Sequence, residues 1–119
     1  MISQKYRFHG HASLRFVLAN GQQARGKSLS IKYTNNPHRH QSRVAIVVSK
    51  KVCKHAVDRN RIRRRLYEII RKQIDKINNK GVFDLAIIVY KADILDKPFN
   101  EIEAEVLSCL TKISKDGKI

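Results

Sequence analysis

A regular series of apolar residues within a basic stretch predicts the longest helix of the chain. Between Lys54 and Asn78, apolar side chains recur at helical spacing, and mostly polar and charged residues fill the positions between them. On a helix these apolar positions share one stripe, because each residue turns the chain by about 100°. The series consists of Ile62, Leu66, Ile69, Ile70, Ile74 and Ile77. We therefore expect a helix that begins between Lys54 and Arg59, with Asp58 as a candidate cap, and ends before Asn78.

Three other segments carry the apolar patterns of β-strands. Residues 28–34 alternate between apolar and polar side chains, which predicts a half-buried strand. Residues 43–48 form a nearly unbroken β-branched run, which predicts a central strand buried on both faces, and residues 83–90 predict another buried strand. The stretch 22–27 remains open between a loop and a further strand. In the first segment, the alternation places Leu29, Ile31 and Tyr33 on one face and Ser30, Lys32 and Thr34 on the other.

Helical patterns flank these strands. Residues 11–20 predict a short helix stopped by Gly21, and Pro98 precedes a last helix with apolar side chains at helical spacing. The order of elements is αβββαβα if a strand forms at 22–27, and αββαβα if it does not. Both orders describe an α+β fold, with helices packed on a small sheet of three or four strands. At 119 residues, of which 42% are hydrophobic, the chain is expected to form a single domain over residues 1–119.

The charge of the chain adds a partner to this picture. A formal net charge of +15 and a pI near 10.3 imply that the partner is acidic. Ten Lys and Arg residues lie between Lys50 and Lys72, against only Asp58 and Glu68. A membrane fits poorly, since the most apolar run, Leu85–Tyr90, is far shorter than the ~20 residues that span a bilayer. Arginines held in place by a buried stripe suit the phosphates of a nucleic acid, because guanidinium groups form paired bonds to phosphate oxygens.

The basic residues between Lys50 and Lys72 have an alternative interpretation: they could form a solvent-exposed helix face that binds no ligand. Such faces usually alternate in sign so that opposite charges pair along the helix, and this one does not alternate. RNA is favoured over DNA, because arginines and Asn60 suit recognition of backbone and shape more than recognition of base edges.

Patterns for catalysis or metal binding do not accompany the basic helix. The acidic residues are scattered, whereas a two-metal nuclease needs carboxylates that converge on ions about 4 Å apart. Two His-x-His pairs, at 9–11 and 38–40, lack a third ligand at zinc spacing, so we expect no tightly bound metal. Cys53 and Cys109 show no disulfide pattern, and the first ten residues have no apolar signal core. These features predict a cytoplasmic protein with reduced thiols.

The order of residues within the basic stretch is itself a motif. It runs Ser-x-Lys, then Ala-Val, then Arg-Asn-Arg-x-Arg-Arg, then Glu. The matching residues are Ser49, Lys51, Ala56, Val57, Arg59, Asn60, Arg61, Arg63, Arg64 and Glu68. This motif resembles the signature of the bacterial ribonuclease P protein subunits, and the length, basicity and element order fit the same family. The chain departs from the family at Tyr67, where Arg is usual, and at Leu14 and Leu18, where two Phe residues are common.

The resemblance implies a subunit of a tRNA-processing endonuclease, a hydrolase whose catalytic groups lie in a partner RNA and use Mg²⁺. The partners would be that catalytic RNA and precursor tRNA, whose 5′ leader would lie in a cleft between the first helix and the sheet; no membrane and no obligate protein partner are implied. The family also has a mixed sheet with a left-handed βαβ crossover, although such crossovers are right-handed in ~98% of cases. The expected RNA contacts are Lys50, Lys51, Lys54, Arg59, Asn60, Arg61, Arg63, Arg64 and Arg65. The candidates for the leader cleft are Leu14, Phe16, Leu18, Lys32 and Tyr33.

Two rival functions remain at this stage. A structural protein of the ribosome would share the charge and the fold class, but would not require the ordered Arg-Asn-Arg block. A protein-only nuclease would require a cluster of carboxylates that the sequence does not suggest.

Overall fold

The elements of the chain follow the αβββαβα order, with one short addition. The computed structural model describes residues 11–35 and 42–117. Residues 22–25 form a strand, which settles the alternative left open by the sequence, and a 3₁₀ helix that was not expected precedes the last helix. The elements are α1 (His11–Asn20), β1 (Gln22–Arg25), β2 (Leu29–Asn35), β3 (Arg43–Val48), α2 (Ala56–Lys80), β4 (Phe83–Val89), η2 (Ala92–Leu95) and α3 (Phe99–Gly117).

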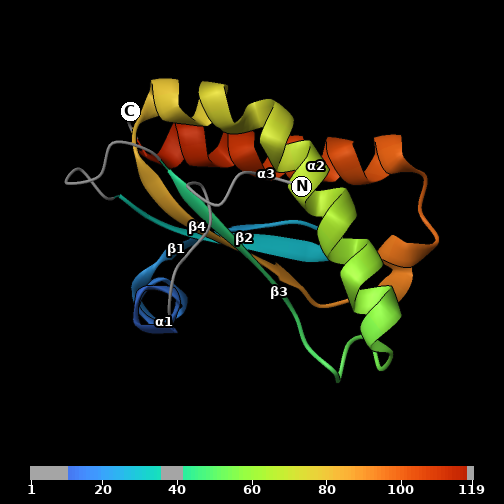
Figure 1. Cartoon of the computed structure of the whole chain (residues 1–119). Coiled ribbons are helices and arrows are strands. Elements are labelled where there is room, and N and C mark those ends of the chain that lie inside the picture. Colours follow the sequence, from blue (N-terminus) through green and yellow to red (C-terminus); the bar gives the residue numbers. More distant parts are fainter. Residues whose placement is uncertain (1–10, 36–41, 118–119) are drawn as a thin grey trace.

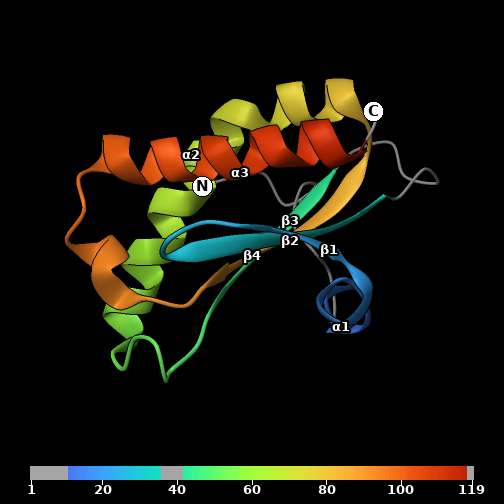
Figure 2. The same cartoon turned by 180° about the vertical axis from the view of Figure 1, so that it is seen from behind.

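The four strands form one mixed sheet between helices. Their order is β1-β2-β4-β3, in which β3 and β4 are parallel and the other neighbours are antiparallel. The long helices α2 and α3 cover one face of the sheet, and α1 packs on the opposite face against β2 and β4 (Figure 1). Figure 2 shows the same layers from behind, with α3 above the β1–β2 hairpin. The expected α+β sandwich is confirmed.

Helix α2 joins the parallel strands β3 and β4 by a left-handed crossover. In Figure 1, β3 lies in front of β4 and α2 lies above both. Consider the sheet viewed from the side of α2, with β3 and β4 both running upward. In this view β4 lies to the left of β3, so the connection through α2 is left-handed. This hand is rare in proteins, and it agrees with what the resemblance implies.

The apolar stripe of α2 forms the centre of the core. All six predicted positions are buried, and four of them, Ile62, Leu66, Ile69 and Ile70, have no exposed surface. They pack with the inward-facing side chains of the sheet in one cluster. Full burial of such a side chain contributes roughly 1.5–3 kcal/mol, so the stripe fixes the rotation of α2 about its axis. That rotation decides which basic side chains face outward.

Strand β3 lies at the edge of the sheet, so its prediction as a central strand was wrong. Val44, Ile46 and Val48 are buried, whereas Ala45 and Val47 on the other face are only half-buried. A β-branched run records burial on the face toward α2, but it cannot tell whether a strand has one neighbour or two.

The end of α2 lies beyond its predicted limit. The helix continues through Asn78 and Asn79 to Lys80. Asn78 stabilises this last turn, because its Oδ1 accepts a hydrogen bond of 2.8 Å from the backbone N–H of Ser42, just before β3. The helix then ends at Gly81, whose φ of 146° lies in a region that favours glycine.

Candidate nucleic-acid interface

Two arginines of α2 project outward without a partner. Arg61 and Arg64 lie one turn apart, on the side of the helix away from the buried stripe, and both are exposed. Neither has a hydrogen bond or an ion pair with any residue in the described part of the chain. Because the stripe holds the helix in place, both side chains extend toward solvent from fixed points of the backbone. Such groups can bind phosphate oxygens through two parallel hydrogen bonds.

Two other arginines of the motif bind the protein's own backbone. Arg59 donates from Nη1 to the carbonyl oxygens of Cys53 (3.0 Å) and Lys54 (2.9 Å). Arg65 donates from Nη1 to three carbonyl oxygens around η2, those of Ile94 (3.4 Å), Leu95 (3.3 Å) and Lys97 (3.4 Å). Arg59 therefore braces the loop before α2, and Arg65 braces the segment after η2. The sequence did not distinguish these two arginines from the outward-facing pair.

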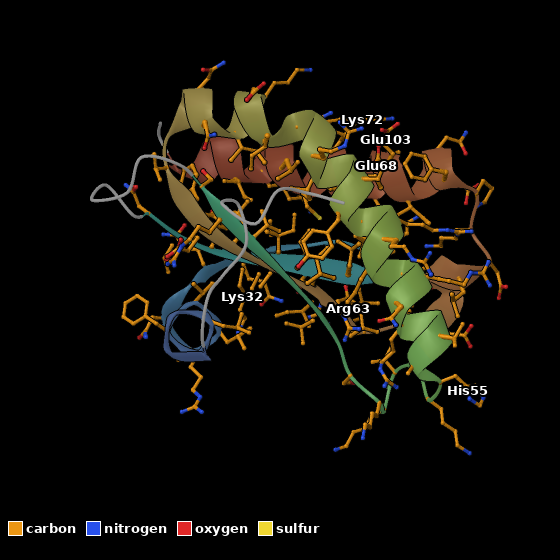
Figure 3. The ribbon with its side chains drawn as sticks, viewed as in Figure 1. Lys32, His55, Arg63, Glu68, Lys72 and Glu103 are labelled. Carbon is orange, nitrogen blue, oxygen red and sulfur yellow. The ribbon has the colours of Figure 1, made fainter. Side chains whose placement is uncertain are left out.

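Arg63 and Asn60 interact with each other along the helix. Nη1 of Arg63 donates to Oδ1 of Asn60 at 2.9 Å, three residues earlier. Arg63 is half-buried, and Figure 3 shows it on the side of α2 toward β3. This bond orients the guanidinium of Arg63 and leaves the amide nitrogen of Asn60 as a donor.

The loop between β3 and α2 extends the basic surface. Its turn is closed by backbone bonds from the N–H groups of Val52 (3.2 Å) and Cys53 (3.0 Å) to the carbonyl oxygen of Ser49, and Cys53 is buried. His55, exposed at the start of α2, is the N-cap, so the prediction of Asp58 as the cap was wrong (Figure 3). The exposed lysines of the loop are Lys50, Lys51 and Lys54.

In the second half of α2, two of the basic side chains have partners within the protein. Arg71 makes a two-pronged ion pair with Glu68, and the hydrogen bond from Arg71 holds the pKa of Glu68 below its usual value. Lys72 lies over the ring of Phe99 on α3, with 5.5 Å between Nζ and the ring centroid. The α2 arginines without a partner among the described residues, Arg61 and Arg64, therefore lie in the first turns of the helix, next to the lysine loop.

On the opposite face of the sheet, α1 and β2 bring two of the predicted cleft residues, Leu18 and Lys32, into contact. Nζ of Lys32 donates to the carbonyl oxygen of Leu18 at 2.7 Å (Figure 3). Leu14 and Leu18 are half-buried beside the fully buried Val17. Phe16 is 58% exposed and is available to a ligand outside the helix.

Tyr33 does not belong to this group. Its side chain is only 4% exposed, and it packs edge-on against Phe83 with 6.0 Å between ring centroids. Its hydroxyl bonds to Oε1 of Gln22 at 3.1 Å. Adjacent strand residues point to opposite faces, so Tyr33 lies under α2 and α3 while Lys32 faces α1.

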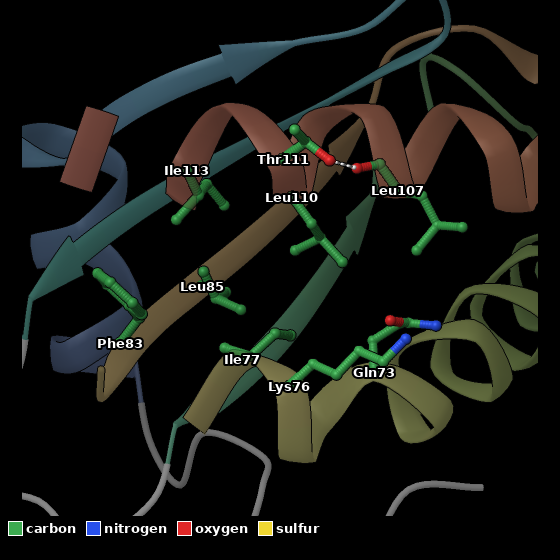
Figure 4. A pocket seen from close by; sticks show the side chains of 9 residues that line it. All are labelled: Gln73, Lys76, Ile77, Phe83, Leu85, Leu107, Leu110, Thr111 and Ile113. Atoms are coloured by element: carbon green, nitrogen blue, oxygen red, sulfur yellow. Dashed lines mark hydrogen bonds between the residues drawn. The ribbon is translucent and has the colours of Figure 1, made fainter. Parts of the chain in front are cut away.

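A separate pocket of about 310 Å³ lies between α2, α3 and β4 (Figure 4). Its walls are mostly apolar, including Ile77, Leu85 and Leu110, and Lys76 is the one charged side chain that lines it. The hydroxyl of Thr111 is turned to its own helix, where it donates to the carbonyl oxygen of Leu107 at 2.9 Å. This pocket does not continue the basic surface.

The described residues contain no group of three or more His, Cys, Asp or Glu side chains that could hold a metal ion. Of the two histidine pairs, His9 and residues 38–40 lie outside the described residues. No helix in the described ranges is long and apolar enough to cross a membrane.

Comparison with known proteins identifies the family. The family model of ribonuclease P matches residues 2–114. The chain belongs to the ribonuclease P protein family. The ribonuclease P protein component of Pseudanabaena sp. (strain PCC 6903) is 32% identical over 113 residues, which cover 94% of each chain. That of Prochlorococcus marinus (strain MIT 9312) is 39% identical over 92 residues, covering 68% of this chain and 72% of the relative.

Solved ribonuclease P proteins share the fold. A mutant of the Staphylococcus aureus RNase P protein, described as defective in mRNA degradation, superposes with a TM-score of 0.80 and 25% identity, covering 94% of this chain and 90% of that one. The RNase P protein from Thermotoga maritima in complex with 1-(4-fluorophenyl)-2-thiourea gives a TM-score of 0.77 at 22% identity, covering 87% and 96%. The chain is thus a protein component of ribonuclease P, a tRNA-processing ribonuclease, and this implies association with the ribonuclease P RNA.

Proposed function

We propose that this chain binds the catalytic RNA of ribonuclease P through the loop of Lys50, Lys51 and Lys54 and the first turns of α2. The observation that carries the proposal is the pair Arg61 and Arg64, held outward by the buried stripe and without partners among the described residues. Because the stripe fixes the helix backbone, both side chains extend from fixed points, and their donors need not break a bond within the described residues before they bind phosphate.

The arginines of the motif have different tasks in this proposal. Arg61, Arg64 and the lysines contact phosphates directly. Arg63 contacts RNA in the orientation set by Asn60, and the amide of Asn60 is free to donate to a ribose or phosphate. Arg59 and Arg65 hold the loop and η2 in place. Their guanidinium N–H groups that make no bond within the described residues can donate to the RNA.

We further propose that the 5′ leader of precursor tRNA lies between α1 and the sheet. Lys32 supplies a cation on this face, Leu14 and Leu18 supply an apolar surface, and the exposed ring of Phe16 on the outer side of α1 is open to stacking with an unpaired base. Tyr33 is buried on the other face and takes no part. The leader would be held as single strand, since stacking and charge do not require a duplex.

The chemical step belongs to the RNA in this proposal. The catalytic RNA would bind the Mg²⁺ ions that activate water and stabilise the leaving oxygen at the mature 5′ end. The protein neutralises phosphates where RNA and substrate approach each other, so it lowers the Mg²⁺ concentration that cleavage requires. The activity is cytoplasmic and needs no other protein.

Reconstitution tests this function. The purified chain, the ribonuclease P RNA and precursor tRNA are combined at limiting Mg²⁺, and cleavage is followed by gel. We expect cleavage at the mature 5′ end only when RNA is present, and faster cleavage when the protein is added. Cleavage by the RNase-free protein alone, abolished by replacing one of its own carboxylates, would overturn the proposal. Binding no tighter than to an unrelated structured RNA of equal length would overturn it as well.

A further inference from the structure

A second basic groove lies on the other side of α3 from α2. It is formed by the turn of the β1–β2 hairpin and one face of α3, and it has a volume of about 730 Å³. Figure 2 shows the hairpin passing below α3 on this side. The charged side chains that line it are Arg25, Lys27, Lys97, Glu101, Glu105 and Lys112.

The floor of the groove is held by hydrogen bonds to Glu105, which also offset part of its charge. Oε2 of Glu105 accepts hydrogen bonds from the backbone N–H groups of Ser28 (2.8 Å) and Leu29 (3.1 Å). Its other oxygen, Oε1, accepts one from Nζ of Lys97 at 3.4 Å. Gly26 lies so close that a Cβ there would come within 2.8 Å of Oε2 of Glu105. The turn therefore packs directly on Glu105, and the charge of this carboxylate is partly offset by the two N–H groups and by Lys97, which also lies 3.5 Å from Asp93.

The rim of the groove carries the free positive charge. Lys27 is exposed and has no hydrogen bond or ion pair with the described residues. Lys112 is exposed and is held toward the turn by a bond of 2.8 Å from its Nζ to the carbonyl oxygen of Arg25. The guanidinium of Arg25 lies 5.4 Å from the centroid of the Tyr90 ring. The groove thus has three cations, Arg25, Lys27 and Lys112, against one uncompensated carboxylate, that of Glu101.

We infer that this groove binds a phosphodiester backbone, and that it is a second RNA-binding site apart from α2. The inference rests on the proposed association with RNA, but on different residues. Arg25 covers a face of Tyr90, the aromatic ring beside the groove, so the groove offers cations for phosphates in place of an open ring for stacking bases. Because α3 separates the groove from α2, the protein would hold two separate stretches of RNA.

Tethered cleavage locates the RNA directly. An iron–EDTA probe is attached at Ser108→Cys, an exposed position lining the groove, in protein assembled with the ribonuclease P RNA. Lys54→Cys reports on the α2 surface, and Lys76→Cys in the apolar pocket serves as the negative control. The native chain, whose two cysteines are buried, is treated with the same probe and measures the background cleavage that does not come from an introduced cysteine. We expect RNA cuts from positions 54 and 108 at different nucleotides, and none from 76.

The outcomes separate the two proposals. Cuts from 54 without cuts from 108 would overturn the groove and leave the α2 surface intact. An absence of cuts from both would overturn both. Equal cuts from 54, 76 and 108 would mean diffuse binding, which also contradicts a groove.

Charge changes test the sign of the ligand. Lys27→Gln should weaken RNA binding roughly three- to tenfold and reduce the salt slope by about 0.9, as expected for one lost phosphate contact. Glu101→Gln should strengthen binding, because it removes the one uncompensated carboxylate. A groove that bound cations would show the opposite response to Glu101→Gln. Lys76→Gln, which removes the same charge elsewhere, should change binding little; equal losses from Lys27→Gln and Lys76→Gln would overturn the inference.

Discussion

Arg43 on β3 holds the carboxylate of Asp84 on β4 by two parallel hydrogen bonds, Nε to Oδ1 at 2.9 Å and Nη2 to Oδ2 at 2.8 Å. Both side chains are buried, and the two residues are register partners in the parallel pair. These strands are joined only through the long left-handed crossover, so their register needs a specific contact. A slip by one residue would separate the pair and reverse the faces of β3.

We expect Asp84→Ala to lower the free energy of unfolding by about 3–5 kcal/mol, because Arg43 would stay buried without this carboxylate. Urea denaturation measures the change. The double variant Arg43→Met with Asp84→Leu should recover much of the loss, since it removes both charges together. A loss below about 1 kcal/mol for Asp84→Ala would show that the pair contributes little to the register.

Replacing Arg61 or Arg64 by Lys should weaken binding to the ribonuclease P RNA by about 1 kcal/mol or more for each change. The charge stays the same, but the planar donor pair that grips phosphate is lost. Filter binding at fixed salt measures the effect, and Lys76→Arg is the matched control with the reverse exchange. If both Arg→Lys variants bound as tightly as the native chain, recognition would depend on charge alone.

Arg64→Gln and Arg65→Gln remove the same charge one residue apart and should have different effects on stability. Arg65→Gln loses the bonds to the carbonyl oxygens around η2 and should lower the free energy of unfolding by roughly 1–2 kcal/mol. Arg64→Gln should leave stability unchanged and weaken RNA binding. The pair is compared by thermal unfolding and by RNA affinity; equal stability of the two variants would mean that Arg65 does not brace η2.

The affinity for RNA should depend steeply on salt. If the protein neutralises about six phosphates, log K should fall with log salt at a slope of about −4 to −5. Affinity would then drop by ~10²–10³ between 50 and 200 mM salt. A slope near zero in a titration over this range would leave the basic surface without a role in RNA binding.

The sequence predicted those parts of the fold that depend on periodicity. The stripe from Ile62 to Ile77 was confirmed because burial on one side of a helix imposes a spacing that no other element shares. Strand β1 could not be decided, since Ala24 is its one buried residue and the others are exposed polar side chains. The edge position of β3 could not be predicted either, because the neighbours of a strand depend on the path of the whole chain.

For the candidate site, the sequence predicted a basic region but could not assign a role to each residue. Spacing along α2 could not reveal that Arg65 points toward η2 while Arg64 points to solvent, since this depends on where residues 92–97 lie. The misplacement of Tyr33 was avoidable. Its alternation with Lys32 already put the two side chains on opposite faces of β2.

The unpaired charges of Arg61 and Arg64 also affect the free protein. Like charges fixed close together raise the energy of the folded state relative to an unfolded chain, in which they can move apart. In the proposed complex, phosphates at Arg61 and Arg64 would remove this penalty only for the folded form, so binding and folding would be thermodynamically linked. The chain should therefore unfold at a lower temperature alone than with its RNA, and inside a cell the protein made in excess over its RNA would be the fraction open to proteolysis.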